Sequence, residues 1–188
     1  MATAPSLPPA SALTTLISQS QDPENPITAL TLQVFHNLQH QHLWTSLRIH
    51  EPRTLSPSQS IPLISGIPPQ SIYIHPDEQA YMLELGIRLE ETAVDREWVI
   101  PTAQGQTWSL RRLAEVFDAL PDRKEDIQAP DSKRGLVSNK VLEYERKKRE
   151  EPWGGKRALL SMVNRNKGGD GTVVYYIILE GTVKPRQN

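Results

Sequence analysis

The sequence predicts one α/β domain in which helices cover a β-sheet, with a disordered tail before it and a charged insertion within it. Its 188 residues are enough for one core-bearing domain with a tail, or at most two very small domains. Two stretches with a helical spacing of apolar residues alternate with short β-like segments. A hydrophobic content of 37%, with 16 prolines and 10 glycines, indicates long irregular connections between these elements.

The composition excludes several classes of protein. Cysteine is absent, which rules out disulfides, thiol catalysis and thiolate metal sites. No apolar run reaches the ~20 residues that span a bilayer, and no secretion signal of a basic segment followed by an apolar stretch is present. We therefore expect a soluble intracellular protein that contacts no membrane and uses no cofactor.

Order is predicted to begin at residue 26. Residues 1–25 are rich in Ala, Ser, Thr and Pro and contain no aromatic side chain, so they cannot bury enough surface to offset chain entropy; at most a short helical turn is expected near Leu13. Asn25 and Pro26 suit the cap and the first position of a helix that runs to about Gln41. This helix is expected to bury its apolar face against a sheet, since a helix of this length is marginal alone in water.

Short strands are predicted in the middle of the chain. Segments 44–49, 61–67 and 98–100 are β-like, the last ended by Pro101. Residues 81–89 alternate apolar and polar side chains, which predicts a strand with one solvated face. The acidic start of this region at residues 77–79 leaves a helix open as the alternative.

A second helix and a charged insertion follow. Residues 108–120 have helical spacing, with Pro121 as the stop and a predicted buried face formed by Leu110, Leu113, Val116, Phe117 and Leu120. The insertion covers about residues 122–153. Within it, residues 138–150 can form an amphipathic helix, which we expect to be stable only in contact with another part of the protein.

The end of the chain carries two predicted strands, residues 157–164 and 172–179, joined by a glycine-rich loop. The second strand reads TVVYYIIL, and its β-branched and aromatic composition is typical of a strand that is covered on both faces. Because only nine residues follow it in this sequence, part of that cover is expected to come from beyond the two helices, for which another chain is one source.

Histidines are the first candidates for chemistry. His36, His40 and the nearby His42 have a spacing that can hold zinc. No carboxylate or cysteine follows at a spacing typical of a zinc site, so a polar helix surface is the favoured interpretation. His75 precedes an Asp-Glu pair and can act as a general acid or base, although a turn residue is the favoured interpretation. Glycines 168–171 lie between two strands, where a hairpin turn explains them better than a phosphate cradle.

Charge is unevenly distributed along the chain. Residues 1–120 carry 6 basic and 12 acidic side chains, whereas residues 121–188 carry 15 and 10. A basic C-terminal third can meet an acidic protein or nucleic acid, although an ordinary solvated surface is favoured. Candidate contacts to RNA phosphates are Lys140, Arg146, Lys147, Lys148 and Arg149.

Four short sequence segments in the part of the chain that is expected to be ordered resemble those of a known family. They are IYIHPDEQ at 72–79, WVIPT at 98–102, WSLRRLAEVF at 108–117 and GTVVYY at 171–176. Together they resemble the small non-catalytic subunit (the subunit-fifteen family) of the eukaryotic tRNA-splicing endonuclease, in its fungal form, over roughly residues 26–188. The resemblance implies the fold of the C-terminal domain of tRNA-intron endonucleases, a mixed sheet flanked by helices, in a nuclear heterotetramer.

The resemblance also implies that this subunit does not cleave RNA. Catalytic members use a Tyr, His and Lys triad, with the Lys at the end of the helix before the penultimate strand. Here that helix ends Asp118-Ala119-Leu120, and Tyr73 and His75 are more closely spaced than the family's pair. No catalytic or metal-binding residue is therefore expected. An active nuclease that uses His75 with Tyr73, and an RNA-binding adaptor that uses residues 140–149, are the alternatives.

What the resemblance implies instead is assembly with the catalytic and structural subunits of the endonuclease, with pre-tRNA contacted indirectly or weakly. Family members join the last strands of two subunits, and the preceding loop docks on a neighbour. The pairing residues are then Thr172, Val173, Val174, Tyr175, Tyr176, Ile177, Ile178 and Leu179. The docking loop, residues 164–171, contains Arg165, Lys167, Gly168, Gly169 and Asp170 and is less acidic than is usual in the family. The isolated chain can also form a homodimer by the same pairing.

Overall fold

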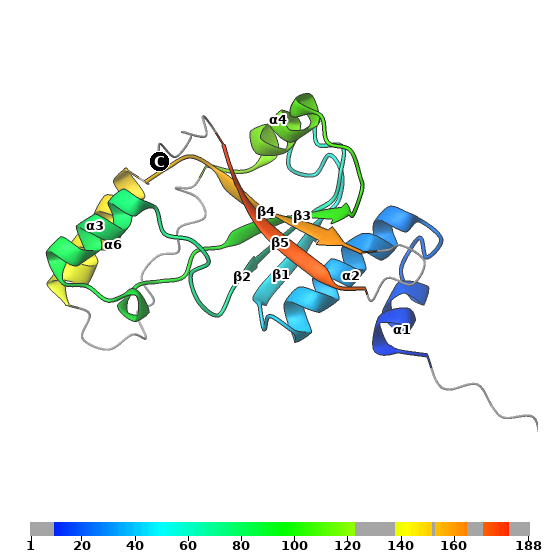
Figure 1. Ribbon diagram of the computed structural model, residues 1–188, viewed down its shortest axis with the longest axis horizontal. Coiled ribbons are helices and arrows are strands. Elements are labelled where there is room, and N and C mark those ends of the chain that lie inside the picture. Colours follow the sequence, from blue (N-terminus) through cyan, green and yellow to red (C-terminus); the bar gives the residue numbers. More distant parts are fainter. Residues whose placement is uncertain (1–9, 123–137, 152, 165–170, 181–188) are drawn as a thin grey trace, which may run out of the picture.

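The computed structural model describes residues 10–122, 138–151, 153–164 and 171–180. These residues form a five-stranded sheet with the strand order β1-β2-β3-β4-β5, in which β3 and β4 are parallel and the other neighbours are antiparallel. The strands are β1 (Thr45–His50), β2 (Leu63–Ile67), β3 (Glu97–Ala103), β4 (Arg157–Val163) and β5 (Val173–Leu179). The predicted mixed sheet flanked by helices is confirmed (Figure 1).

Two helices cover opposite faces of the sheet. Helix α2 (Pro26–His40) packs its apolar side chains against alternate residues of the central strands, in a cluster that includes Leu30, Val34, Leu38, Ile64, Val99 and Leu159. Helix α4 (Leu110–Ala119) packs against the other set, in a cluster that includes Val116, Phe117, Leu63, Trp98, Ile100 and Ala158. Because successive strand residues point to opposite faces, the sheet is apolar on both sides, as a sheet between two helical layers must be.

A second helical unit lies at one end of the molecule. Helices α3 (Pro76–Leu85) and α6 (Asn139–Glu150) are side by side in Figure 1, and a small apolar cluster joins them through Met82, Val141 and Tyr144. The predicted helix over residues 138–150 is therefore confirmed, and α3 supplies the contact that it needs. A 3-10 turn, η1 (Leu89–Glu91), follows α3.

The predicted strand over residues 81–89 was wrong, because the end signals of α3 outweigh the period-two pattern. The Nδ1 atom of His75 accepts a hydrogen bond of 3.2 Å from the backbone N–H of Asp77, and Pro76 occupies the first helical position. Gly86, with φ +67°, ends the helix in the left-handed conformation that a side chain disfavours.

Three boundaries also differ from the predictions. Residues 12–18 form helix α1 (Ala12–Ser18), which is capped by Ser11 and contacts α2, within the predicted tail. Strand β3 continues through Pro101. Its pairing with β2 ends at Val99, so the missing N–H of the proline leaves no β2–β3 hydrogen bond unmade. Leu110 is 86% exposed rather than buried, since it is the first residue of α4 and only the later turns reach the sheet.

Residues 123–137 of the insertion and residues 165–170 of the proposed docking loop lie outside the described part of the chain. Within the described ranges, none of the helices has the length and apolar character required to span a bilayer.

Candidate protein interface at the C-terminal strand

Strand β5 is an edge of the sheet. It pairs with β4 over seven residues, from Arg157 opposite Leu179 to Val163 opposite Val173. Among the residues that the structure describes, no strand pairs with the other side of β5. A sheet edge of this kind presents a row of backbone donors and acceptors to any strand that approaches it.

The backbone groups that face outward can be assigned from the ends of the β4–β5 ladder. The N–H of Asn164 donates to the carbonyl of Thr172 at 3.2 Å, and the N–H of Glu180 donates to the carbonyl of Lys156 at 2.9 Å. Both are directly opposite pairs in this register, and antiparallel strands alternate hydrogen-bonded with non-hydrogen-bonded pairs. The N–H and C=O groups that point away from β4 therefore belong to Val173, Tyr175, Ile177 and Leu179.

The side chains of β5 are apolar, and the described residues only partly cover them. Val174 and Tyr176 lie on the α4 face and are 45% and 53% exposed. Ile177 and Leu179, on the α2 face, are 41% and 47% exposed. The composition predicted a strand covered on both faces, and within the described residues that cover is incomplete on both.

Tyr175 fixes the middle of this edge to α2. Its hydroxyl donates a 2.7 Å hydrogen bond to Oδ1 of Asn37, and its ring meets the ring of His42 edge to face at 5.1 Å. Burial raises the pKa of Tyr175, so the hydroxyl stays protonated and remains a donor throughout the physiological range. Strand β5 is thus held in an extended conformation before any partner arrives.

The opposite edge of the sheet is less regular. The register of β1 with β2 shifts between Thr45 and Arg48, and Ser46 has φ +49°. The guanidinium of Arg96 donates to the carbonyl of Ser46 at 2.9 Å and so occupies an acceptor of that strand. Bulges and occupied backbone groups blunt an edge against strand addition, which leaves β5 as the better template.

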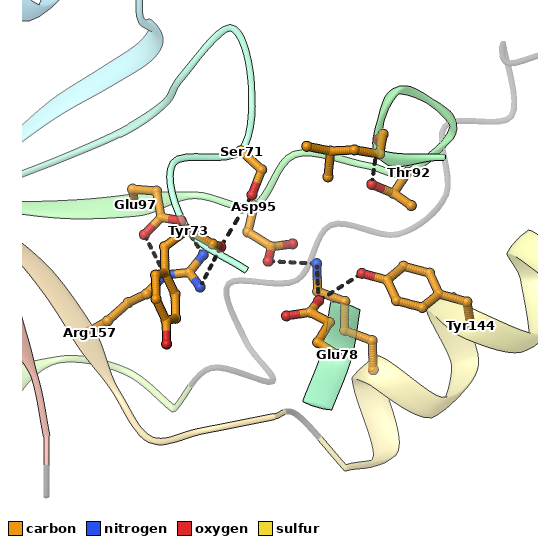
Figure 2. A network of polar contacts seen from close by, with 10 residues as sticks. Ser71, Tyr73, Glu78, Thr92, Asp95, Glu97, Tyr144 and Arg157 are labelled. Atoms are coloured by element: carbon orange, nitrogen blue, oxygen red, sulfur yellow. Dashed lines mark hydrogen bonds and ion pairs between the residues drawn. The ribbon is translucent and has the colours of Figure 1, made fainter. Parts of the chain in front are cut away.

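A buried ionic network joins the α3–α6 unit to the sheet (Figure 2). Glu97 of β3 accepts hydrogen bonds from Nε and Nη2 of Arg157, and Nη1 of Arg157 donates to the carbonyl of Tyr73. Nearby, Nζ of Lys148 lies 2.7 Å from Asp95 and 3.6 Å from Glu78, which also accepts a 2.7 Å hydrogen bond from the Tyr144 hydroxyl. This network was not predicted from the sequence, although one charged residue begins each of two apolar strands, Glu97 in EWVI and Arg157 in RALL, and signals part of it.

Burial and pairing act in opposite directions on Arg157. Burial alone lowers its pKa, whereas the hydrogen bonds and charge of Glu97, with the charges of Asp95 and Glu78, raise the pKa above its ordinary value. The guanidinium therefore stays charged inside the protein. The network fixes the segment around Tyr73 and the α3–α6 unit relative to β3 and β4.

Comparison with known proteins supports the resemblance seen in the sequence. The family model described as Sen15 protein matches residues 33–138, which is more than half of the chain. The chain belongs to the Sen15 family. A protein of Neurospora crassa described as a probable tRNA-splicing endonuclease subunit, tsp-1, is 34% identical over 179 residues, which are 94% of this chain and 72% of the relative. Membership of the family supports a role in tRNA splicing as a subunit of an endonuclease complex.

The proposed RNA contacts of this Sen15-family chain are not equivalent in the structure. Lys148 is buried in the ionic network, and Nζ of Lys147 lies 4.2 Å from the ring centroid of Tyr81. Lys148 is therefore not placed to reach RNA. Lys140, Arg146 and Arg149 are exposed and Lys147 is partly exposed, and for these four residues RNA contact stays a prediction.

The histidines have structural contacts. His75 caps α3. The carbonyl of Tyr73 accepts a hydrogen bond from Arg157, and the guanidinium carbon of Arg157 lies 5.6 Å from the centroid of the Tyr73 ring. The rings of His36 and His40 are 4.4 Å apart. In the described part of the chain, no three His, Asp or Glu side chains gather as a metal site would require.

Proposed function

We propose that this chain is a non-catalytic subunit of the tRNA-splicing endonuclease and that it binds a catalytic subunit by adding the partner's strand to β5. The observation that carries the proposal is the row of outward N–H and C=O groups on an apolar edge strand of a Sen15-family protein. Strand addition would satisfy these groups and bury apolar side chains on both faces at once. Nuclear localisation is part of this proposal.

The contacts of the nuclease candidates support a non-catalytic role. His75 and Tyr73 are engaged in capping and in the ionic network. The helix directly before the penultimate strand β4 is α6 rather than α4, and near its end Lys148 is buried with Asp95 and Glu78. At the end of α4, Nζ of Lys156 donates hydrogen bonds of 3.1 and 2.7 Å to the carbonyls of Phe117 and Leu120. A lysine engaged by a helix end is less available to stabilise a phosphorane.

The test is co-purification with the catalytic subunits after co-expression. Tyr176→Asp places a charge on the exposed face of β5, and Leu179→Pro removes one outward N–H while leaving the inward ladder intact. We expect both variants to fold and to lose the partner. The matched control is Leu83→Asp, at a leucine of α3 that is 72% exposed, and it should retain the partner.

The result that contradicts the proposed interface is wild-type recovery of the partner with both β5 variants. Cleavage of intron-containing pre-tRNA by the purified chain alone, lost in His75→Ala, would instead establish the nuclease alternative.

A further inference from the structure

A pocket of about 280 Å³ lies beside β5 on the face that α2 covers. Its walls are mainly apolar and come from α2, the segments that follow α2 and β2, and the last two strands: Leu38, Trp44, Ile72, Leu159, Tyr175 and Ile177. Leu38, Trp44 and Leu159 are buried in the main core, so they cannot move aside easily. Pro68 and Pro69 also line the pocket, and their rings restrict the backbone there. The pocket is therefore a built feature of the fold.

The pocket is continuous with the free edge of β5. Ile177 contributes an outward backbone N–H and C=O to that edge, and its half-exposed side chain lines the pocket. In paired strands, directly opposite side chains lie on the same face with their Cβ atoms about 4.5–5.5 Å apart. A residue placed opposite Ile177 would therefore project its side chain to the mouth of the pocket.

We propose that this pocket receives one large apolar or aromatic side chain from the strand that the catalytic subunit adds to β5. The inference rests on the proposed function and names the chemistry that the partner strand must carry. Small-molecule sites commonly have about 300–1,000 Å³, so this pocket is at the lower end of that range and has room for one large side chain. The hydroxyl of Tyr175 is already bonded to Asn37, so the Tyr175 wall offers the ligand mainly ring carbon.

The pocket would act as the anchor of the interface. Backbone pairing along an edge is tolerant of sequence, whereas a filled pocket fixes both the register and the choice of partner. Burial of one large apolar side chain corresponds to about 10- to 100-fold in Kd.

The test fills the pocket from its rim. Gln70 is exposed and lines the pocket, so the indole of Gln70→Trp can fold into the space that the partner's side chain would use. We expect the Kd between the full chain and the purified catalytic subunit to rise about 10- to 100-fold, with the melting temperature of the free chain unchanged or raised. Two controls should bind like the wild type: Gln70→Lys, whose side chain stays in solvent, and Gln79→Trp, on the exposed surface of α3.

A cross-linking experiment provides the second measurement. The natural sequence has no cysteine, so Gln70→Cys gives a unique attachment point for a benzophenone probe. Illumination of the complex should label a large apolar residue within the strand that pairs with β5. A label elsewhere, or a wild-type Kd for Gln70→Trp, overturns the pocket proposal. If Leu179→Pro still abolishes binding in that case, strand addition stands without the pocket; if Leu179→Pro also binds normally, the proposed interface itself fails.

Discussion

Glu97 and Arg157 form an ion pair inside the sheet, at the first residues of the parallel strands β3 and β4. Their side chains are 6% and 7% exposed, and Nε of Arg157 donates to Oε2 of Glu97 at 3.0 Å. Because Arg157 also donates to the carbonyl of Tyr73, the pair connects the segment before α3 to the centre of the sheet.

Replacing only one residue of the Glu97–Arg157 pair should lower the free energy of unfolding far more than replacing both. Arg157→Met leaves the Glu97 carboxylate buried without its counter-charge, which should lower the free energy of unfolding by about 3–5 kcal/mol. In the double variant Glu97→Leu/Arg157→Met much of that loss should be recovered. Urea unfolding of the three proteins measures both values, and a single variant within about 1 kcal/mol of wild type would contradict the prediction.

Lys148 should contribute to the stability of the fold. Lys148→Met removes the cation that Asp95 and Glu78 share, so we expect a loss of about 3 kcal/mol in unfolding free energy and a loosened α3–α6 unit. The neighbouring Arg149→Met is the matched control, because Arg149 is exposed, and it should stay within about 0.5 kcal/mol of wild type. Equal effects of the two substitutions would refute the assignment of Lys148 to the interior.

The two adjacent tyrosines of β5 should respond differently to loss of the hydroxyl. Tyr175→Phe removes the bond to Asn37 and should cost about 0.5–1.5 kcal/mol of stability in the free chain. Tyr176→Phe, at an exposed position, should leave the stability unchanged. The comparison by thermal or urea unfolding shows whether β5 is anchored to α2, and a reversed order of the two variants would contradict that anchoring.

His50 should make the protein less stable in mild acid. Burial, followed by the charges of Arg96 and Arg48, lowers the pKa of His50 below its ordinary 6.5, so the unfolded chain binds this proton more readily than the folded protein does. Stability should therefore rise with pH through the region just below 6.5 and fall on acidification. His50→Gln keeps a polar group near Ser65 but cannot titrate, so its unfolding free energy should depend less steeply on pH. Identical slopes for the two proteins would remove His50 as the cause.

The elements that the sequence predicts best are those with local signals. The Asn25-Pro26 start of α2 and the β-branched run of β5 were both recognised from composition and spacing. The region around Tyr81 was misassigned because its period-two pattern is local. The helix instead depends on the signals at its two ends and on packing against Tyr144 of α6 and against Trp153, which follows α6.

The candidate site was only partly predictable for a similar reason. Composition alone identified β5 as a strand in need of cover, but its position at the edge depends on strand order, which no local pattern encodes. Arg157 pairs with Glu97, 60 positions away in the sequence, and Lys148 pairs with Glu78, 70 positions away. No local motif joins residues so far apart, so these ion pairs emerge only from the fold. The pocket beside β5 likewise draws its walls from distant parts of the chain, namely residues 38–44, residues 68–72, β4 and β5.

Amide hydrogen exchange along β5 tests the central claim most directly. In the free, monomeric chain, the outward amides of Tyr175 and Ile177 should exchange fast, whereas the inward amides of Tyr176 and Ile178 should be protected by β4. In the complex with the catalytic subunit, Tyr175 and Ile177 should become protected as well. Outward amides that are already slow in the monomer, or that remain fast in the complex, would contradict strand addition at β5.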